Sequence, residues 1–262
     1  MLEANEIVAP IVFAEKWQGG VYSPRGEVRG TCFAIGGDYC LTAGHVVEAL
    51  AGCPPDLGPV IAFRHQGRWA TAEIRTTELL TADVGLVRFA FMDSKDMPRP
   101  VVLPWRLQMV PLLTTVKTIG YPYGLSYADG EVRFTTRAFL GHVVSTRVKY
   151  KPVGYQGNPF CAYELSYVAP EGLSGAPLLC GDEPTVVIGL VIGNNESKIL
   201  FHQDSYVEKE SEGEEAKTTV HEHYRYHHLG VSVISSEIAN TRSELLGKSI
   251  GEHLKEHGLI EQ

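Results

Sequence analysis

The chain has 262 residues, enough to bury a sizeable core in one large or two small domains. Hydrophobic residues make up 44% and charged residues 21% of it, as in an ordinary globular protein. The formal net charge of −8 argues against a nucleic-acid partner, because contacts to the phosphate backbone need a basic surface.

The N-terminal stretch MLEANEIVAPIVFAEKW lacks a basic region followed by an apolar stretch and a cleavage site, so we expect no signal peptide. No apolar run approaches the length of a membrane span, so we expect no membrane partner. The cysteines are Cys32, Cys40, Cys53, Cys161 and Cys180, an odd number that does not suit a disulfide framework. We interpret them as buried free thiols in a reducing, cytoplasmic location, with a Cys32–Cys40 bridge as the alternative.

Short alternating or β-branched runs dominate the chain, and Gly, Pro, Asn and Asp separate them. This pattern is typical of antiparallel sandwiches and barrels. The chain has no alternation of strands and helices, so we do not expect a doubly wound parallel sheet. In chain order, we expect strands at residues 7–13, 29–35, 39–42, 60–65, 68–76, 84–89, 114–119, 132–146, 162–166, 176–180, 185–192 and 229–234.

A proline-rich stretch divides these strands into two groups. Residues 91–111 contain four prolines and interrupt the strand rhythm. We therefore predict an N-terminal unit at residues 1–98, a linker at 99–111 and a second unit at 112–235.

Two further segments follow within and after the second unit. Residues 194–221 are charged and poor in apolar side chains, so we expect a mobile surface loop there. Beyond residue 235, apolar residues at near-helical spacing predict a helix at 236–257. We expect this helix, within a terminal unit at 236–262, to pack on the second half.

Three motifs carry residues suited to acyl transfer: LTAGHV with His45, TADVGL with Asp83 and EGLSGAP with Ser174. A serine hydroxyl is a poor nucleophile until a base takes its proton, and a carboxylate can orient that base. The order His, Asp, Ser differs from the orders in α/β-hydrolases and subtilisin-like enzymes.

Each motif also has a structural explanation when taken alone. A histidine beside a glycine is often structural, and an aspartate before a strand can cap a turn. The glycines around Ser174 carry the stronger signal, because a tight loop there can direct the amides of Gly172 and Ser174 at one point. Such paired donors stabilise an oxyanion by about 3–4 kcal/mol each.

Two additional segments extend the pattern, IGYPYG at residues 119–124 and GHVVS at 141–145. Together with the three motifs they resemble the chymotrypsin-like serine peptidases, especially the bacterial HtrA type, over residues 30–234. The resemblance implies two six-stranded antiparallel β-barrels with the active site at their junction. With the C-terminal α-helix, the expected fold is all-β and chymotrypsin-like.

The resemblance also implies roles for individual residues. His45 would be the general base, Asp83 its orienter and Ser174 the nucleophile, with oxyanion amides from Gly172 and Ser174. An extended substrate would pair with the strand formed by Val191, Ile192, Gly193 and Asn194. Val168 would form the floor of the specificity pocket, and Asn194 and Gly230 its walls.

Three residues depart from the family pattern. Leu173 stands where relatives have an aspartate that pairs with a new N-terminus, so activation of that kind is not expected. Val168 replaces the acid that selects Arg or Lys, which favours a small or medium apolar side chain. Ile192 stands where many relatives have a serine that supports the triad acid.

Five histidines crowd the 194–221 stretch and the strand after it. Their spacing has some likeness to zinc ligands, but a metal site usually has a more definite ligand frame. We therefore expect a solvated face, and no metal or cofactor. The histidines are His202, His221, His223, His227 and His228.

The motifs favour a serine endopeptidase that acts on a polypeptide substrate, with a regulatory protein partner as a further expectation. Two alternatives remain open at this stage. One is a catalytically silent module of the same fold that binds a partner peptide. The other is an esterase that uses the same three residues.

Overall fold

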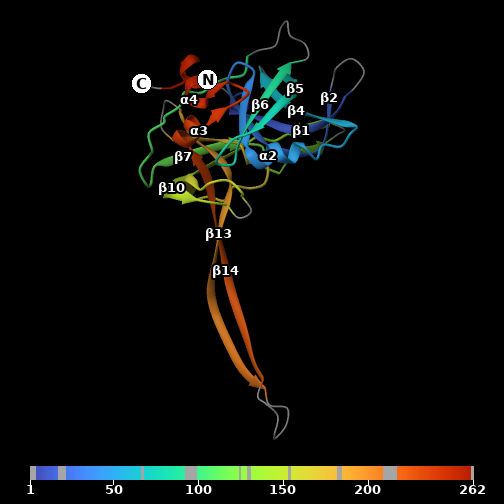
Figure 1. The fold of residues 1–262 in the computed structure, drawn as a ribbon. Helices are drawn as coiled ribbons and strands as arrows, with labels where there is room; N and C mark the ends of the chain where they lie inside the picture. The colour runs from blue at the N-terminus through green and yellow to red at the C-terminus, as the bar shows by residue number, and fades with distance from the viewer. Residues whose placement is uncertain are drawn as a thin grey trace.

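A computed structural model describes residues 4–16, 22–65, 68–91, 99–123, 125–128, 131–152, 155–181, 185–208 and 217–260 of the chain. Its strands form two closed six-stranded barrels with antiparallel pairing. Figure 1 shows the barrels packed together, with a long hairpin projecting from them. The predicted all-β fold with two antiparallel barrels is confirmed.

The first barrel contains β1 to β6, with α1 (Ala4–Ile7) before β1 and α2 (Gly44–Leu50) after β3. Alternating apolar residues place fully buried side chains such as Ile11, Ile61 and Leu86 in one core. In order of pairing, the strands are β1 (Ala9–Lys16), β2 (Tyr22–Gly36), β3 (Tyr39–Ala43), β6 (Val84–Phe91), β5 (Arg68–Leu79) and β4 (Leu57–His65).

The second barrel follows the linker, and a small hairpin of β8 (Leu125–Ala128) and β9 (Glu131–Phe134) lies beside it. A separate apolar cluster that includes Leu165, Leu173 and Leu178 fills this barrel. In order of pairing, its strands are β10 (Arg137–Tyr150), β11 (Phe160–Leu165), β14 (Lys217–Ile234), β13 (Val187–Glu208), β12 (Pro177–Cys180) and β7 (Thr115–Gly120).

The stretch between the barrels is anchored by Trp105. Its side chain is fully buried and packs 5.9 Å from the Phe33 ring of β2, measured between ring centroids. Its backbone N–H donates to Leu259 O, and the residue also forms a bridge to Val187. The linker residue thus contacts the first barrel, the second barrel and the end of the chain.

All five cysteines are free thiols, but they differ in burial. Cys32, Cys40 and Cys180 are buried, whereas Cys53 and Cys161 are half-buried, so the expectation of buried thiols holds for three of them. Burial raises the pKa of Cys40, and a hydrogen bond with Cys32 raises it further.

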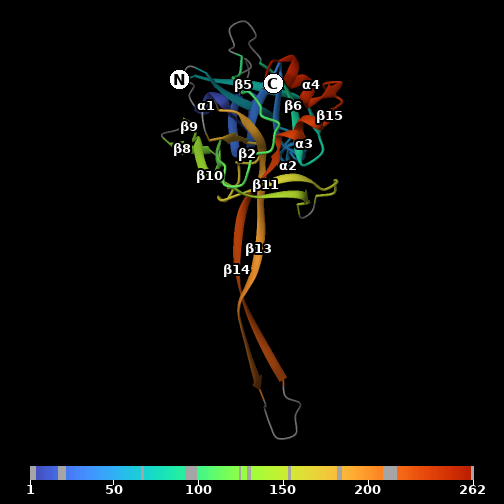
Figure 2. The same ribbon diagram turned by 90° about the vertical axis from the view of Figure 1, so that its left-hand side faces the viewer.

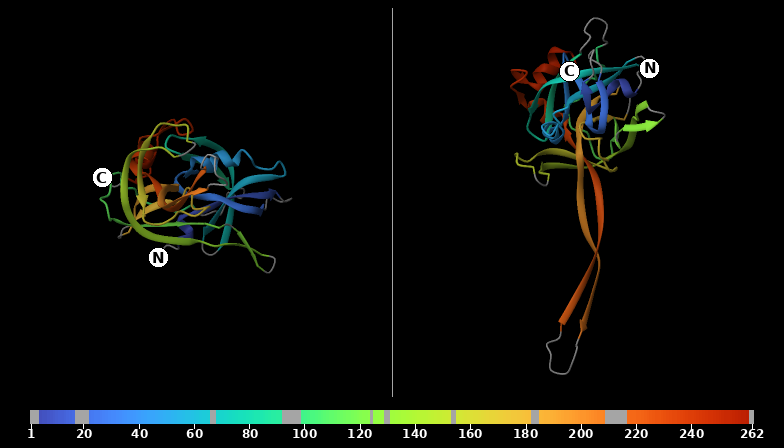
Figure 3. Two further views of the ribbon diagram at one scale, coloured as in Figure 1. Left: turned by 90° about the horizontal axis from the view of Figure 1, so that it is seen from below. Right: turned by 90° about the vertical axis from the view of Figure 1, so that its right-hand side faces the viewer.

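The expected loop at 194–221 is wrong for residues 194–208 and 217–221, which continue β13 and β14 as a two-stranded arm. Residues 209–216 lie outside the described ranges. The pairing runs from Asn194 opposite Gly230 to Glu208 opposite Lys217, with one bulge between Leu200 and His202. Figure 2 and the right-hand view of Figure 3 show the arm leaving the barrels as a thin ribbon. Its many aromatic and β-branched residues favour strand despite the high charge.

The expected C-terminal helix is present as α4, but it does not run as one helix over 236–257. The segment forms α3 (Ser235–Asn240), a hairpin of β15 (Arg242–Ser243) and β16 (Lys248–Ser249), and then α4 (Ile250–Glu256). Ser243 Oγ donates to Glu78 Oε2 in the first barrel at 2.5 Å, which anchors the hairpin. Ser249 and Glu252 then form a capping box that starts α4 anew.

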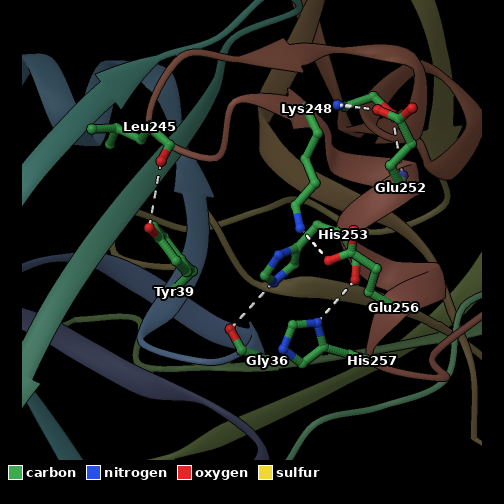
Figure 4. A network of polar contacts seen from close by, with 9 residues as sticks. Gly36, Tyr39, Leu245, Lys248, Glu252, His253, Glu256 and His257 are labelled. Carbon is green, nitrogen blue, oxygen red and sulfur yellow. Dashed lines mark hydrogen bonds and ion pairs between the residues drawn. The ribbon is translucent and has the colours of Figure 1, made fainter.

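The last helix packs on the first barrel rather than on the second half alone. His253 Nε2 lies 3.3 Å from Gly36 O, and the His253 ring meets the Tyr39 ring edge-on. Figure 4 shows these contacts together with the ion pair between Lys248 and Glu256. No helix in the described ranges is long and apolar enough to cross a membrane.

Acid should loosen the attachment of α4. Burial lowers the pKa of His253, and the nearby charge of His257 lowers it further. The unfolded chain therefore binds this proton more tightly, so the stabilisation is complete above about pH 6.5 and is lost as pH falls below it. We expect the free energy of unfolding to fall between about pH 7.5 and about pH 5.5. Urea denaturation measures it.

The matched variant is His253→Gln, which keeps an N–H donor for Gly36 O but does not titrate. Its free energy of unfolding should change less over the same pH range. An equal pH dependence in the two proteins would contradict the role given to His253.

Candidate active site

Strand pairing brings the histidine motif against the aspartate motif. β3 pairs with β6 so that Ala43 lies opposite Val84, and α2 begins at the next residue, Gly44. A Cβ added at Gly44 would lie 2.8 Å from Asp83 Oδ1, so only glycine lets the carboxylate approach. His45 follows in the first turn of α2.

Asp83 accepts two hydrogen bonds from the same residue. Oδ1 accepts from the backbone N–H of His45 at 2.8 Å, and Oδ2 lies 3.0 Å from His45 Nδ1. The carboxylate favours the tautomer in which Nδ1 carries the proton, which leaves Nε2 as the acceptor. The Asp83 side chain is 14% exposed and that of His45 45% exposed, so the ring can reach a bound molecule.

Asp83 sits in a strained turn between β5 and β6. Ala82 and Asp83 have φ values of 61° and 54°, and Val84 N–H donates to Thr81 O across the turn. Positive φ values at both central residues are typical of a type I′ turn. Glycine and asparagine are more common than alanine at these positions. Such left-handed residues persist only where their surroundings hold them.

Two contacts from the C-terminal half hold this turn. The Ala82 N–H donates to Tyr155 Oη at 2.8 Å, and Thr81 Oγ1 lies 2.9 Å from Thr241 Oγ1. Tyr155 precedes β11 and Thr241 follows α3. Sequence reasoning did not single out either residue, because each lies more than 70 positions from the turn that it contacts.

Ser174 lies in a tight loop built by two left-handed glycines. The Leu173 N–H donates to Pro170 O at 3.0 Å, and Gly172 has φ +87°, as the third residue of a type II turn requires. Gly175 has φ +89°, and a Cβ added there would lie 2.1 Å from Thr31 O. Both positions therefore need glycine.

Thr31 of β2 docks this loop onto the first barrel. Its N–H donates to Ser174 O at 2.8 Å, and its Oγ1 donates to Gly172 O at 2.8 Å. The same Oγ1 accepts from the N–H of Tyr121 at 3.1 Å. Thr31 is fully buried, and its own carbonyl accepts from Thr42 Oγ1 in β3. One buried threonine thus joins the Ser174 loop to the strand that precedes His45.

The loop leaves two backbone donors available near Ser174. The Glu171 carbonyl accepts from the Tyr123 N–H at 3.1 Å, so the N–H across the same planar peptide, that of Gly172, points the other way. Within the described part of the chain, neither the Gly172 nor the Ser174 N–H donates a hydrogen bond. Two such amides are the donor set that an oxyanion needs.

The loop that carries Ser174 lies against the strand that leads to His45. A Cβ added at Gly175 would lie 2.9 Å from Ala43 N, so the serine loop abuts the end of β3. Among the described residues, no hydrogen bond joins the Ser174 hydroxyl to His45. Catalytic hydrogen bonds of this kind are often long until substrate binds.

Asn194 and Gly230 bond to the two residues that flank Val168. Asn194 makes two 2.7 Å hydrogen bonds to the backbone of Ala169, through Oδ1 and Nδ2. Gly230 N–H donates to Tyr167 O at 2.7 Å and is the register partner of Asn194. The Val168 side chain between these anchors is 49% exposed.

The expected substrate strand is only partly available for pairing. The Val191 N–H and C=O bond to Ala176 O and Gly175 N, so Val191 cannot pair with a substrate, contrary to expectation. A bulge leaves Ile192 without a partner in β14, and Gly193 has open space where a side chain would be. Beyond Leu190, no described strand pairs with β13 on the β12 side.

The arm begins directly from this strand and is anchored in the barrel. Asn195 Nδ2 donates to Glu164 Oε1 at 2.7 Å, and Arg147 Nη2 lies 2.7 Å from the same oxygen. Burial alone would raise the pKa of Glu164, but the hydrogen bonds from Arg147 and Asn195 outweigh it and lower the pKa. A buried, ionised carboxylate therefore fixes the point where the arm starts.

The structure shows how Leu173 is accommodated at the position where the family pattern has an aspartate. Its side chain is fully buried in the core of the second barrel, and a Cβ added at Gly120 would lie 2.8 Å from Leu173 Cδ1. Apolar packing thus holds the loop where relatives use a charged aspartate. Ile192 is also buried.

Comparisons with known proteins agree with this architecture. Residues 30–190 match the family model of the trypsin-like peptidase domain. The active form of the Rv3671c protease from M. tuberculosis is similar, with 17% identity, a TM-score of 0.51, and coverage of 90% of this chain and 79% of that chain. The MamO protease domain from Magnetospirillum magneticum has 14% identity, a TM-score of 0.52, and coverage of 90% and 95%.

Deg5 is also similar, with 15% identity, a TM-score of 0.51, and coverage of 72% of this chain and 80% of that chain. At these identities the structural likeness shows the fold alone. A search of curated proteins finds no match.

Removing the Tyr155 hydroxyl should loosen the turn that carries Asp83. In Tyr155→Phe the Ala82 N–H loses its acceptor, which should lower the free energy of unfolding by about 1 kcal/mol. The Nδ1–H proton of His45, observed by NMR, should exchange with water faster because Asp83 holds it less firmly. Tyr123→Phe removes an exposed hydroxyl and should leave this proton unchanged. Equal exchange in wild type and Tyr155→Phe would show that the turn does not depend on Tyr155.

Proposed function

Since the chain belongs to the trypsin-like peptidase family, we propose that it is a serine endopeptidase that forms an acyl-enzyme on Ser174. One observation carries the proposal: Asp83 holds His45 by two hydrogen bonds beside a loop with two unused amides. These are the parts that acyl transfer to a serine requires.

In the first half of the reaction, the Ser174 hydroxyl attacks the carbonyl carbon of the substrate. His45 Nε2 takes the hydroxyl proton as the bond from Oγ to carbon forms. The carbonyl oxygen becomes an oxyanion and accepts hydrogen bonds from the amides of Gly172 and Ser174. Asp83 stays ionised and stabilises the imidazolium.

Collapse of this intermediate breaks the carbon–nitrogen bond, and His45 gives its proton to the leaving amine. A water molecule then attacks the acyl-enzyme and transfers a proton to His45 Nε2. That proton returns to Ser174 Oγ as the acid leaves. The His45 ring and the Ser174 hydroxyl must first turn toward each other, which we expect substrate binding to promote.

The backbone of an extended substrate would pair with residues 192–194, at the edge of β13 that no described strand covers. Its side chain at the cleaved bond would enter the region around Val168. That residue has no charge and lies between the anchored Asn194 and Gly230. We therefore propose a preference for a small or medium apolar side chain.

The free thiols support a proposal about location. Cys32 and Cys40 lie close enough for a hydrogen bond and remain unpaired. Neighbouring free thiols persist most readily in a reducing compartment. We propose that the protein acts in the cytoplasm.

A second candidate function is supported by the missing hydrogen bond between Ser174 and His45. In that case the chain is a catalytically silent module that binds an extended peptide along β13. An esterase with the same residues would share the chemistry and differ only in its substrates.

A fluorophosphonate probe should label the wild-type chain at Ser174 and leave Ser174→Ala unlabelled. Asp83→Asn keeps the shape of the acid but favours the wrong tautomer of His45, so labelling should slow by up to roughly four orders of magnitude. Mass spectrometry of the intact chain measures the rate.

His142→Ala is the matched control, because His142 is an exposed histidine on β10, outside the proposed site. It should be labelled like the wild type. A folded wild-type chain that resists labelling would favour the silent module. Labelling with turnover of esters but not of fluorogenic peptides would favour the esterase.

A further inference from the structure

The arm formed by β13 and β14 beyond residues 194 and 230 has no neighbouring strand in the described part of the chain. The two strands pair only with each other from Asn195 opposite Leu229 to Glu208 opposite Lys217. The views in Figures 1 and 2 show no other element beside this ribbon. A two-stranded hairpin alone is marginally stable in water. An additional link between its strands would therefore stabilise it.

The register of the arm brings two short motifs opposite each other. β13 contains His202 and Asp204, and β14 contains His221 and His223. His202 is the register partner of His223, and Asp204 is the register partner of His221. A motif of histidine and aspartate one residue apart thus faces a motif of two histidines one residue apart.

These four residues share one face of the ribbon. Positions two apart on a strand lie on the same face, and so do register partners. The bulge between Leu200 and His202 shifts the pairing by one residue, and this shift places His202 opposite His223. Cβ atoms of register partners lie about 4.5–5.5 Å apart, and diagonal neighbours lie about 7–8 Å apart. The four positions therefore form a compact rectangle.

Three imidazoles and one carboxylate match the ligand preference of zinc. Zn²⁺ takes four nitrogen, sulfur or oxygen ligands in a tetrahedral arrangement. Calcium and magnesium prefer oxygen ligands, so a set rich in histidine does not suit them. His221 and His223 are exposed to solvent, so a metal ion can reach them.

We propose that this face of the arm binds one divalent transition-metal ion of the zinc class, with His202, Asp204, His221 and His223 as its ligands. Among the side chains that the structure describes, no three ligands are already gathered into a metal site. The side chains of His202 and Asp204 lie outside that part. The site is defined by register, and the metal links the two strands far from the barrels.

The sequence favoured a solvated face because the segment looked mobile and offered no definite ligand frame, and His202 and His221 are 19 positions apart. The hairpin removes that separation. The proposal needs no catalytic activity, so it stands or falls independently of the proposed function.

Isothermal titration of the full chain with ZnCl₂, after removal of metal with a chelator, tests the proposal. We expect one zinc ion per wild-type chain. The double variant His221→Ala/His223→Ala should bind at least about tenfold more weakly, since even supporting residues of metal sites change affinity by that much. These positions lie outside the barrels, so the variant should fold, and circular dichroism checks this.

His228→Ala is the matched control, because His228 lies on the opposite face of the arm, 4.0 Å from Glu196 Oε2 through its Nδ1. It should bind zinc like the wild type. Hydrogen exchange gives a second readout: zinc should slow exchange of the backbone amides on both strands around residues 202–204 and 221–223, but not in the double variant.

Three results would overturn the proposal. The first is a wild-type chain that does not bind zinc. The second is binding that survives in the double variant, which would place the ion elsewhere. The third is an equal loss of affinity in His228→Ala.

Discussion

The docking of the serine loop on Thr31 is the contact on which the rest of the site depends. The Thr31 N–H and hydroxyl bond the carbonyls of Ser174 and Gly172, residues 141 to 143 positions away, while Thr42 bonds Thr31 from the strand that leads to His45. Thr31, Thr42 and Gly172 are buried. A hydrogen bond that a buried group leaves unmade costs about 1–3 kcal/mol. The two barrels therefore hold the Ser174 loop and the strand that leads to His45 in one fixed relation.

The turn that carries Asp83 is likewise held by contacts from the other half of the molecule. Asp83 belongs to the first barrel, but its strained turn is held by Tyr155 and Thr241, which come from the C-terminal half. The residues beyond β14 also contact the first barrel, through Glu78 and Gly36. The Ser174 loop and the Asp83 turn are thus each stabilised by the half of the molecule to which they do not belong, so the barrels and the C-terminal segment act as one unit.

The sequence predicted the elements whose signal is local. Glycines at 172 and 175 around a serine indicate a tight loop, and alternating strands indicate an antiparallel sandwich or barrel. The choice of two barrels came from the family resemblance. It did not predict Thr31, Tyr155 or Thr241, because an isolated Thr or Tyr says nothing about a partner far along the chain. The arm was missed because its charge suggested a loop, although Tyr, Val, Ile and Thr in it favour strand. The C-terminal helix was split because Ser243 bonds Glu78 of the first barrel, and no helical periodicity reports that contact.

The most direct test of this account is the reaction rate of Thr31→Val with a fluorophosphonate probe. Valine keeps the shape and the backbone N–H of residue 31 but removes the hydroxyl that bonds Gly172 O and Tyr121 N–H. We expect labelling at least about tenfold slower. The loss of one buried hydrogen bond should displace the amides of Gly172 and Ser174 and raise the activation free energy of labelling by roughly 1.4 kcal/mol or more. Labelling of a folded Thr31→Val chain at the wild-type rate would contradict it.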